Sequence, residues 1–364
     1  MAPAPLDPCE DTDPRRGLFD PDPEAAPDPW FSPSPEVDPP GPDASRRRRT
    51  DPQAWRAAQD RHSGALADLA ALFGALDERL RAGPEGWRHR LALLEVADLG
   101  WWTGARLPMD QLALWVGLRR GATGAAAQDL IRAGWAVRRL SGGPGPAEGP
   151  QPADDPWRAG LAAFLGRGAP GAGGVGAGGP GEGGVGGVTD LAGILSQTGG
   201  LHPVTQAAIL FHGWRGLAPG AAADVEAAVL AARHGAAAGR GAALFLPLAL
   251  NGSGALRATG TEDRRLGAWI AGATQAVRAA LRHLDRLQDW QGRARAATAD
   301  LSGRTPPALI TALAAWPMIS APLAERITGA SRAAAQRNLD LLAVRGLIRE
   351  VTGQGRFRMW AARI

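Results

Sequence analysis

The residues best suited to chemistry lie in a short stretch near the C-terminus that contains Ser331, Arg332, Ala333, Gln336 and Arg337. On a helix the last four of these positions share one face, because residues four apart lie above one another. Their side chains are small, amide or guanidinium. Guanidinium and amide groups pair with the edges of guanine and adenine, and arginine also binds phosphate. The stretch therefore predicts a surface that contacts double-stranded DNA.

A helix-turn-helix is predicted to position these side chains. The first helix is expected over residues 305–316, which open with a threonine cap and two prolines. Ser320 is the predicted N-cap of the second helix, and residues 328–330 form a short turn that contains glycine. Ser331 then caps a third helix over residues 332–345. The inner face of that helix is expected to consist of Ala335, Leu339 and Leu342.

A β-hairpin is predicted to follow, with strands over 347–351 and 356–360 and a tight turn over 352–355. In a winged helix-turn-helix this hairpin is the wing. We expect three of its side chains to contact the DNA backbone: Gln354, Arg356 and Arg358. Residues 302–364 hold nine arginines and three acidic residues, and this balance favours a polyanionic partner. The alternative is a protein-interaction module, since small folds of this kind also bind proteins.

Six stretches carry a similarity to known proteins: Leu76–Arg81, Gly86–Arg88, Ala97–Leu107, Ser331–Leu339, Gly346–Gly353 and Arg356–Arg358. The C-terminal three resemble the winged helix at the C-terminus of many Fic-family proteins. They are still more similar to the helix-turn-helix of an uncharacterised bacterial family, which pairs a helical domain of unknown function with a C-terminal DNA-binding domain. The N-terminal three resemble the opening of that second family. This resemblance implies DNA binding. We expect the protein to act as a transcriptional regulator.

Composition divides the rest of the chain into helical regions and linkers. Residues 1–50 are rich in proline and acidic residues and are predicted to be a disordered tail, and 141–188 form a linker rich in glycine and proline. Residues 51–140 and 189–301 show the apolar periodicity of helices. The predicted fold is therefore all-α with a small β-wing, in which a helical domain precedes a winged helix-turn-helix at 302–364.

A long amphipathic helix is predicted over residues 262–301, directly before the winged helix. Arginines 278, 282 and 286 line one of its faces, and its apolar stripe consists of Leu266, Trp269, Ile270, Ala273, Val277, Leu281, Leu284 and Leu287. Two uses of this stripe are open. It could form a homodimer, or it could pack within the chain on the helix predicted at 204–214.

The sequence does not predict an enzyme. Fic-type nucleotidyl transfer needs a histidine followed by an acidic loop with Asn and Arg, and neither His202 nor His212 is followed by one. The histidines lack metal-binding spacing, so these two are expected to cap or pack helices. The glycine-rich run has no lysine for a phosphate-binding loop. We expect no catalytic residue, metal or cofactor. A degenerate Fic-like scaffold and an enzyme with an unrecognised site are the alternatives.

Cysteine usage and hydropathy bear on location. Cys9 is the only cysteine, which fits a reducing cytoplasm, and no apolar segment is long enough to span a membrane. All 40 basic residues are arginine, as a GC-rich genome would produce, so the absence of lysine is not read as a functional choice.

Overall fold

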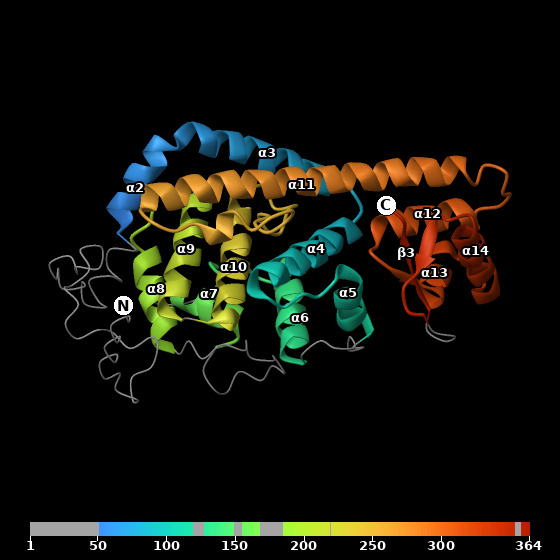
Figure 1. The fold of residues 1–364 in the computed structure, drawn as a ribbon, viewed down its shortest axis with the longest axis horizontal. Helices are drawn as coiled ribbons and strands as arrows, with labels where there is room; N and C mark the ends of the chain where they lie inside the picture. The colour runs from blue at the N-terminus through green and yellow to red at the C-terminus, as the bar shows by residue number, and fades with distance from the viewer. Residues whose placement is uncertain (1–50, 119–126, 149–154, 168–184, 219, 354–357) are drawn as a thin grey trace, which may run out of the picture. The chain divides into compact units, whose positions relative to one another are not determined.

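The computed structural model describes residues 51–118, 127–148, 155–167, 185–218, 220–353 and 358–364 (Figure 1). These residues are mostly helical with one small antiparallel sheet, which confirms the predicted fold class at that level. The predicted tail and most of the glycine-rich run lie outside them. The helices before the C-terminal region are α2 (Pro52–Arg61), α3 (Ser63–Ala82), α4 (Gly86–Thr103), α5 (Met109–Leu118), α6 (Ala127–Ser141), α7 (Pro156–Leu165), α8 (Val185–Leu195), α9 (Pro203–Leu217), α10 (Ala221–Gly235), η1 (Ala236–Ala238), η2 (Ala255–Arg257) and α11 (Glu262–Ala296).

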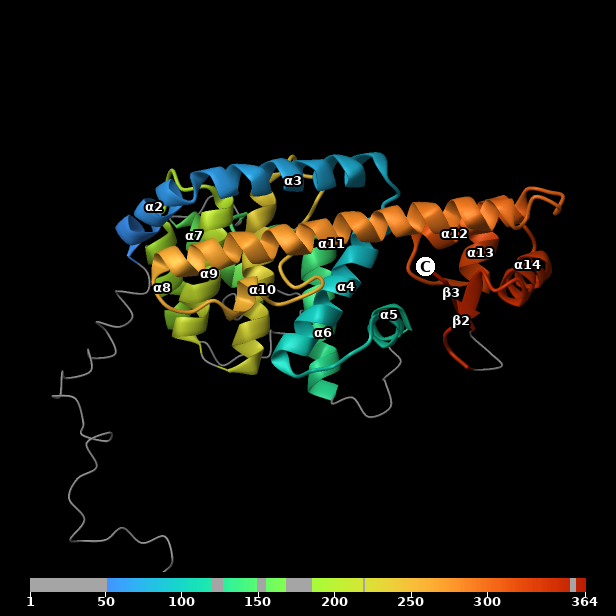
Figure 2. The same cartoon turned by 45° about the horizontal axis from the view of Figure 1, so that its top comes forward.

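Helix α11 is the predicted long helix, although it ends at Ala296 because the chain turns over the next four residues. It lies alongside α3 and reaches from the helical region to the C-terminal elements (Figures 1 and 2). Its apolar stripe is buried within the chain, and Trp269 packs on Phe211 of α9 with ring centroids 5.3 Å apart. The stripe is therefore used intramolecularly, and the predicted homodimer would need another surface. No described helix is long and apolar enough to cross a membrane.

The apolar periodicity of residues 54–82 favours a single helix, but the structure divides this stretch into α2 and α3 at His62. The His62 ring packs against α11, where its Nε2 lies 3.1 Å from the Asp263 carbonyl oxygen. A Cβ at Gly267 would lie 2.9 Å from that ring, so glycine permits the contact. The bend depends on a partner about 200 residues away in sequence, and local periodicity does not reveal it.

Two buried carboxylates hold the segment between α10 and η2. Asp77 accepts hydrogen bonds from the N–H groups of Ala242 and Ala243 at 2.9 and 2.6 Å. Glu95 accepts three more, from residues 248–250, at 2.8 to 3.1 Å. Buried backbone donors need such partners. Burial raises the pKa of Glu95 to about 7, although these donors oppose the shift.

Helix α7 lies within the segment predicted as a linker. Asp155 caps it by accepting a hydrogen bond from the Arg158 N–H at 3.0 Å. Leu161, Phe164 and Leu165 are buried in the main hydrophobic core. Three apolar residues at helical spacing therefore attach this short helix to the rest of the helical region.

The last elements form a second hydrophobic core around Trp290, Leu313 and Trp360. They are α12 (Thr305–Ala315), β1 (Ile319–Ser320), α13 (Ala321–Thr328), α14 (Arg332–Val344), β2 (Ile348–Glu350) and β3 (Met359–Ala362). The strands form an antiparallel sheet in the order β1-β3-β2, with Ile319 opposite Trp360 and Ile348 opposite Ala362. We call these elements the C-terminal module. The returning strand lies later than the predicted 356–360, and β1 was not predicted.

The C-terminal module is attached to α4 by hydrogen bonds to the carbonyl oxygens at the end of α12. Trp87 Nε1 donates to the Ala314 oxygen at 3.1 Å, and Arg90 Nη2 donates to the Leu313 oxygen at 3.0 Å. A Cβ at Gly86 would lie 2.4 Å from the Ala315 oxygen, so only glycine allows this close approach. These contacts satisfy carbonyls that a helix end leaves without intrahelical partners.

Candidate nucleic-acid interface

Helix α14 is positioned by a glycine turn and a serine cap. Gly329 ends α13 in the left-handed region, with φ of 67°. The Ser331 hydroxyl then accepts a hydrogen bond from the Ala334 N–H at 3.3 Å, as the sequence predicts. The capped helix buries the three expected residues against α12 and α13: Ala335, Leu339 and Leu342. Its opposite face is therefore fixed in orientation by the packing of this inner face.

The outer face of α14 carries the side chains that the sequence assigns to DNA recognition. Ser331, Arg332, Ala333 and Arg337 are exposed, and Gln336 is half-buried. Within the described part of the chain, no hydrogen bond or ion pair of the Arg337 side chain is found. Its guanidinium is therefore available to an external partner.

Acidic side chains pair with most of the other residues that are predicted to contact DNA. The sequence shows that these acidic residues are present but not where they lie. Arg332 Nε lies 2.7 Å from Glu325 Oε2, across the turn between α13 and α14. Gln336 Nε2 donates to both oxygens of Asp340 at 3.0 and 3.1 Å. Arg358 Nη1 lies 3.1 Å from the same carboxylate. Exposed pairs of this kind contribute only about 0 to 1 kcal/mol each, so an anionic partner can replace them.

Arg358 is the one predicted wing residue that the structure describes, because Gln354 and Arg356 lie outside the described residues. Its Nε lies 3.3 Å from Glu350 Oε2, and its guanidinium stacks over the Trp360 ring at 5.0 Å. It therefore lies at the base of the hairpin, next to α14.

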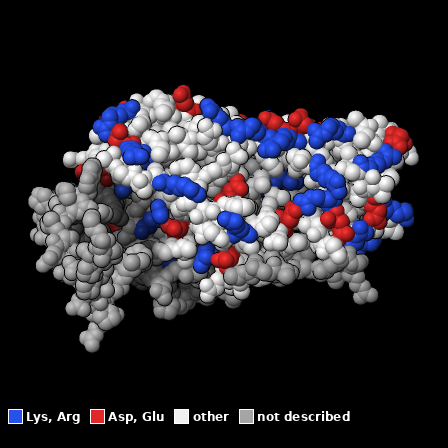
Figure 3. Space-filling model, viewed as in Figure 1, with Lys and Arg blue, Asp and Glu red and all other residues white. Residues whose placement is uncertain are grey.

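Two further arginines of the C-terminal module hold it in place. Arg345 forms a bidentate pair with Asp300 at 2.6 and 2.7 Å, and Arg349 pairs with Asp110 of α5. The Arg345 guanidinium lowers the pKa of Asp300. On the face seen in Figure 3, basic and acidic side chains alternate over this part of the molecule. The excess of arginine in the sequence therefore does not form one continuous basic patch there.

The two histidines considered for catalysis cap and pack helix α9, as expected. His202 caps α9, where its Nδ1 accepts the Val204 N–H at 3.2 Å. His212 is buried, and burial with the nearby Arg265 and Arg215 lowers its pKa to about 3. Among the described residues, no group of three His, Cys, Asp or Glu side chains could hold a metal ion.

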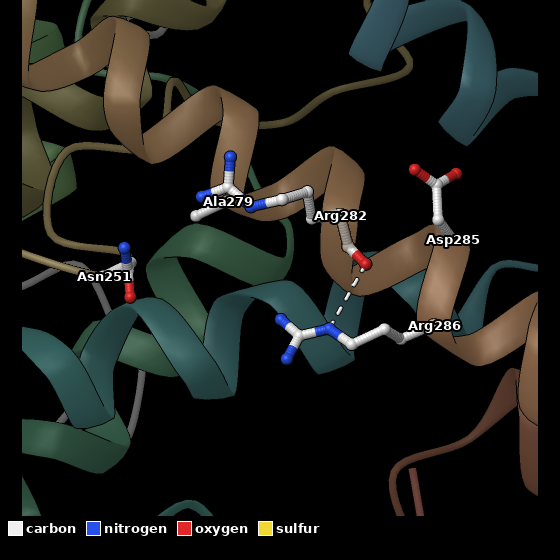
Figure 4. A pocket seen from close by; sticks show the side chains of 5 residues that line it. All are labelled: Asn251, Ala279, Arg282, Asp285 and Arg286. Carbon is white, nitrogen blue, oxygen red and sulfur yellow. Dashed lines mark hydrogen bonds between the residues drawn. The ribbon is translucent and has the colours of Figure 1, made fainter.

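A pocket of about 520 Å³ lies on α11 beside Asn251 (Figure 4). Arg282 and Arg286, from the arginine row that the sequence shows, line it, and Arg286 Nε donates to the Arg282 carbonyl oxygen at 3.3 Å. Asp285 is held on another side by Arg79 at 2.7 Å. No buried polar atom without a partner belongs to the residues that line this pocket. It is therefore an open basic groove on the surface.

A second cavity, of about 460 Å³, lies where α4, α5 and α11 face β2 and β3. Sequence reasoning missed it, because its polar lining residues are scattered along the chain: Arg90, Asp110, His283, Arg349 and Arg363. No local motif brings such residues together.

Comparisons with known proteins do not assign the chain: no protein-family model matches it, and no similar curated protein was found. The family resemblance therefore stays a prediction. Inference about function rests on the geometry of α14 and its surroundings.

Proposed function

We propose that the C-terminal module is a winged helix-turn-helix that binds double-stranded DNA, and that the protein is a transcriptional regulator. The observation that carries this proposal is the outer face of α14, where Arg337 is exposed without a partner in the described residues and Ser331, Arg332 and Ala333 form an exposed N-terminal turn. In DNA-binding helix-turn-helix proteins, the second helix of the motif lies in the major groove and its N-terminal residues contact base edges.

The order of elements supports the assignment. Helix α13 ends at Gly329, and α14 begins after a short turn, as the motif requires. A strand before α13 and the β2–β3 hairpin after α14 complete a three-stranded sheet. In this arrangement α14 enters the major groove, and the hairpin approaches the flanking backbone with Arg358 and the predicted contacts Gln354 and Arg356.

The ion pairs of the outer face are compatible with this role. Arg332 would exchange Glu325 for a phosphate, and Gln336 would exchange Asp340 for a base edge. Because surface pairs are weak, each exchange costs little. The acidic groups also repel phosphates that approach in a wrong register, which raises specificity more than affinity.

Binding of the full chain to random-sequence duplex DNA across a salt series tests the proposal. We expect Arg337→Gln to weaken binding and to reduce the slope of log affinity against log salt by about 1, if Arg337 contacts a phosphate. A base contact would instead cost about 1 to 3 kcal/mol on a preferred sequence. Arg240→Gln is the matched control, because Arg240 is also exposed but lies in the loop after η1. Equal affinities and slopes for the wild type and Arg337→Gln would reject the assignment of α14.

A protein-interaction module without catalytic activity is the second candidate, and one observation favours it. Val344, at the end of α14, is 85% exposed, and Ile327 on α13 is 41% exposed. Contiguous exposed apolar side chains mark protein-binding sites, and these two would have to belong to one such patch. If neither the wild type nor any variant binds DNA at low salt, this candidate replaces the first.

A further inference from the structure

The cavity between α4, α5, α11 and the strands of the C-terminal module, which we call the junction cavity, has the features of a binding site. Its volume of about 460 Å³ lies within the range of small-molecule pockets. Leu94, Met109 and Ala361 supply apolar walls, while charged groups come from both the helical region and the module.

Three residues that line the junction cavity carry buried polar atoms without a hydrogen-bond partner among the described residues. These atoms are Arg90 Nε, Asp110 Oδ1 and His283 Nε2, and they come from α4, α5 and α11. Arg90 is 1% exposed, and its Nη2 donates a hydrogen bond to the Leu313 carbonyl oxygen of α12. A buried polar atom left unpaired costs about 1 to 3 kcal/mol, and these three place polar groups directly behind the wall of the junction cavity.

The charges around the junction cavity favour an anion. Arg90, Arg349 and Arg363 line it, and the single acidic residue in the lining, Asp110, is paired with Arg349. Burial lowers the pKa of Arg90 to about 10, so it stays charged at neutral pH. Burial and nearby Arg90 and Arg286 lower the pKa of His283 to about 4, so its ring is neutral and can donate or accept one hydrogen bond.

We propose that the junction cavity binds a small organic anion that carries a hydroxyl or amino group. Its carboxylate or phosphate pairs with the accessible guanidinium groups of Arg349 and Arg363. Its hydroxyl or amino group donates to the Asp110 carboxylate, and its carbon skeleton packs on Leu94 and Met109. Arginine suits such anions because its planar group forms paired hydrogen bonds.

The junction cavity lies between the helical region and the C-terminal module, so its occupant would contact both. A ligand that binds one arrangement of these two parts more tightly than another would regulate DNA binding. This regulatory part rests on the proposed DNA-binding function, whereas the binding of an anion does not.

Ligand binding is tested on the full chain without DNA. The probes are hydroxycarboxylates and sugar monophosphates, with inorganic phosphate and sulfate for comparison, and the readouts are melting temperature and calorimetric titration. We expect at least one organic probe to raise the melting temperature. Arg363→Gln should weaken its binding about tenfold or more, because a charge-assisted hydrogen bond is lost. Arg363 is exposed, so this variant should fold normally.

Arg326→Gln is the matched control, because Arg326 is an exposed arginine of the same module outside the junction cavity. Binding that is unchanged in Arg326→Gln and weakened in Arg363→Gln supports the site. Failure of every organic probe to bind the wild type, or equal binding by both variants, overturns it. Because DNA is absent from this experiment, its failure is separate from a failure of DNA binding.

Discussion

Replacing Asp340 by asparagine should tighten DNA binding while slightly weakening the fold. Asp340 accepts two hydrogen bonds from Gln336 Nε2, at 3.0 and 3.1 Å, and pairs with Arg358 Nη1 at 3.1 Å. The substitution removes one negative charge beside the outer face of α14 and releases part of the Arg358 guanidinium. Both effects favour a polyanion at this face.

The magnitude follows from two contributions. A carboxylate about 8 Å from a phosphate repels it by about 0.5 kcal/mol in water, and salt screens part of this energy. A released Arg358 that gains one phosphate contact raises the salt slope by about 0.9. Together they predict binding about two to ten times tighter at low salt. Stability should fall by up to about 1 kcal/mol, because the lost pairs are partly exposed.

Fluorescence anisotropy with labelled duplex DNA, at several salt concentrations, measures both quantities. Asp289→Asn is the control, because Asp289 is an exposed aspartate of α11 and its substitution changes the net charge equally. A general effect of net charge would appear in both variants. If Asp340→Asn binds DNA more weakly than the wild type, or with the same salt slope as Asp289→Asn, the placement of DNA against α14 and the wing is incorrect.

Three predictions concern the scaffold. Gly86→Ala should lower the free energy of unfolding in urea by about 1 to 3 kcal/mol or more, because its Cβ would lie 2.4 Å from the Ala315 oxygen. Gly74→Ala, with nothing within 4 Å, should instead stabilise α3 by up to about 1 kcal/mol. Because burial raises the pKa of Glu95 to about 7 from 4.5, its protonation stabilises the fold fully below pH 4.5, and this stability is lost as pH rises through 7. Relative to Glu95→Gln, the wild type should lose about 2 to 3 kcal/mol between pH 5 and pH 8. An equal pH dependence in the two proteins would contradict that pKa shift.

The sequence predicted correctly the features that depend only on neighbouring residues. The serine caps at Ser320 and Ser331 and the inner face of α14 depend on residues within a few positions, and the structure confirms them. The break at His62 depends on Gly267, and β1 is only two residues long and exists by pairing with β3. Such features depend on contacts between distant segments, which a single sequence does not show.

The pairing of charges in the candidate site also depends on contacts between distant segments. The sequence gives nine arginines in residues 302–364, but it does not show which of them an acidic residue already holds. In the structure Arg345 and Arg349 attach the module to the turn after α11 and to α5.

Arg332 and Arg358 form ion pairs with acidic side chains, whereas Arg337 has no partner among the described residues. Because every basic residue of this chain is arginine, the residue type alone carries little information about function. The strongest evidence for a DNA-binding surface is therefore the position of Arg337 on a capped helix whose inner face is buried. The proposal is therefore tested by substitution of Arg337 and not by the net charge of the module.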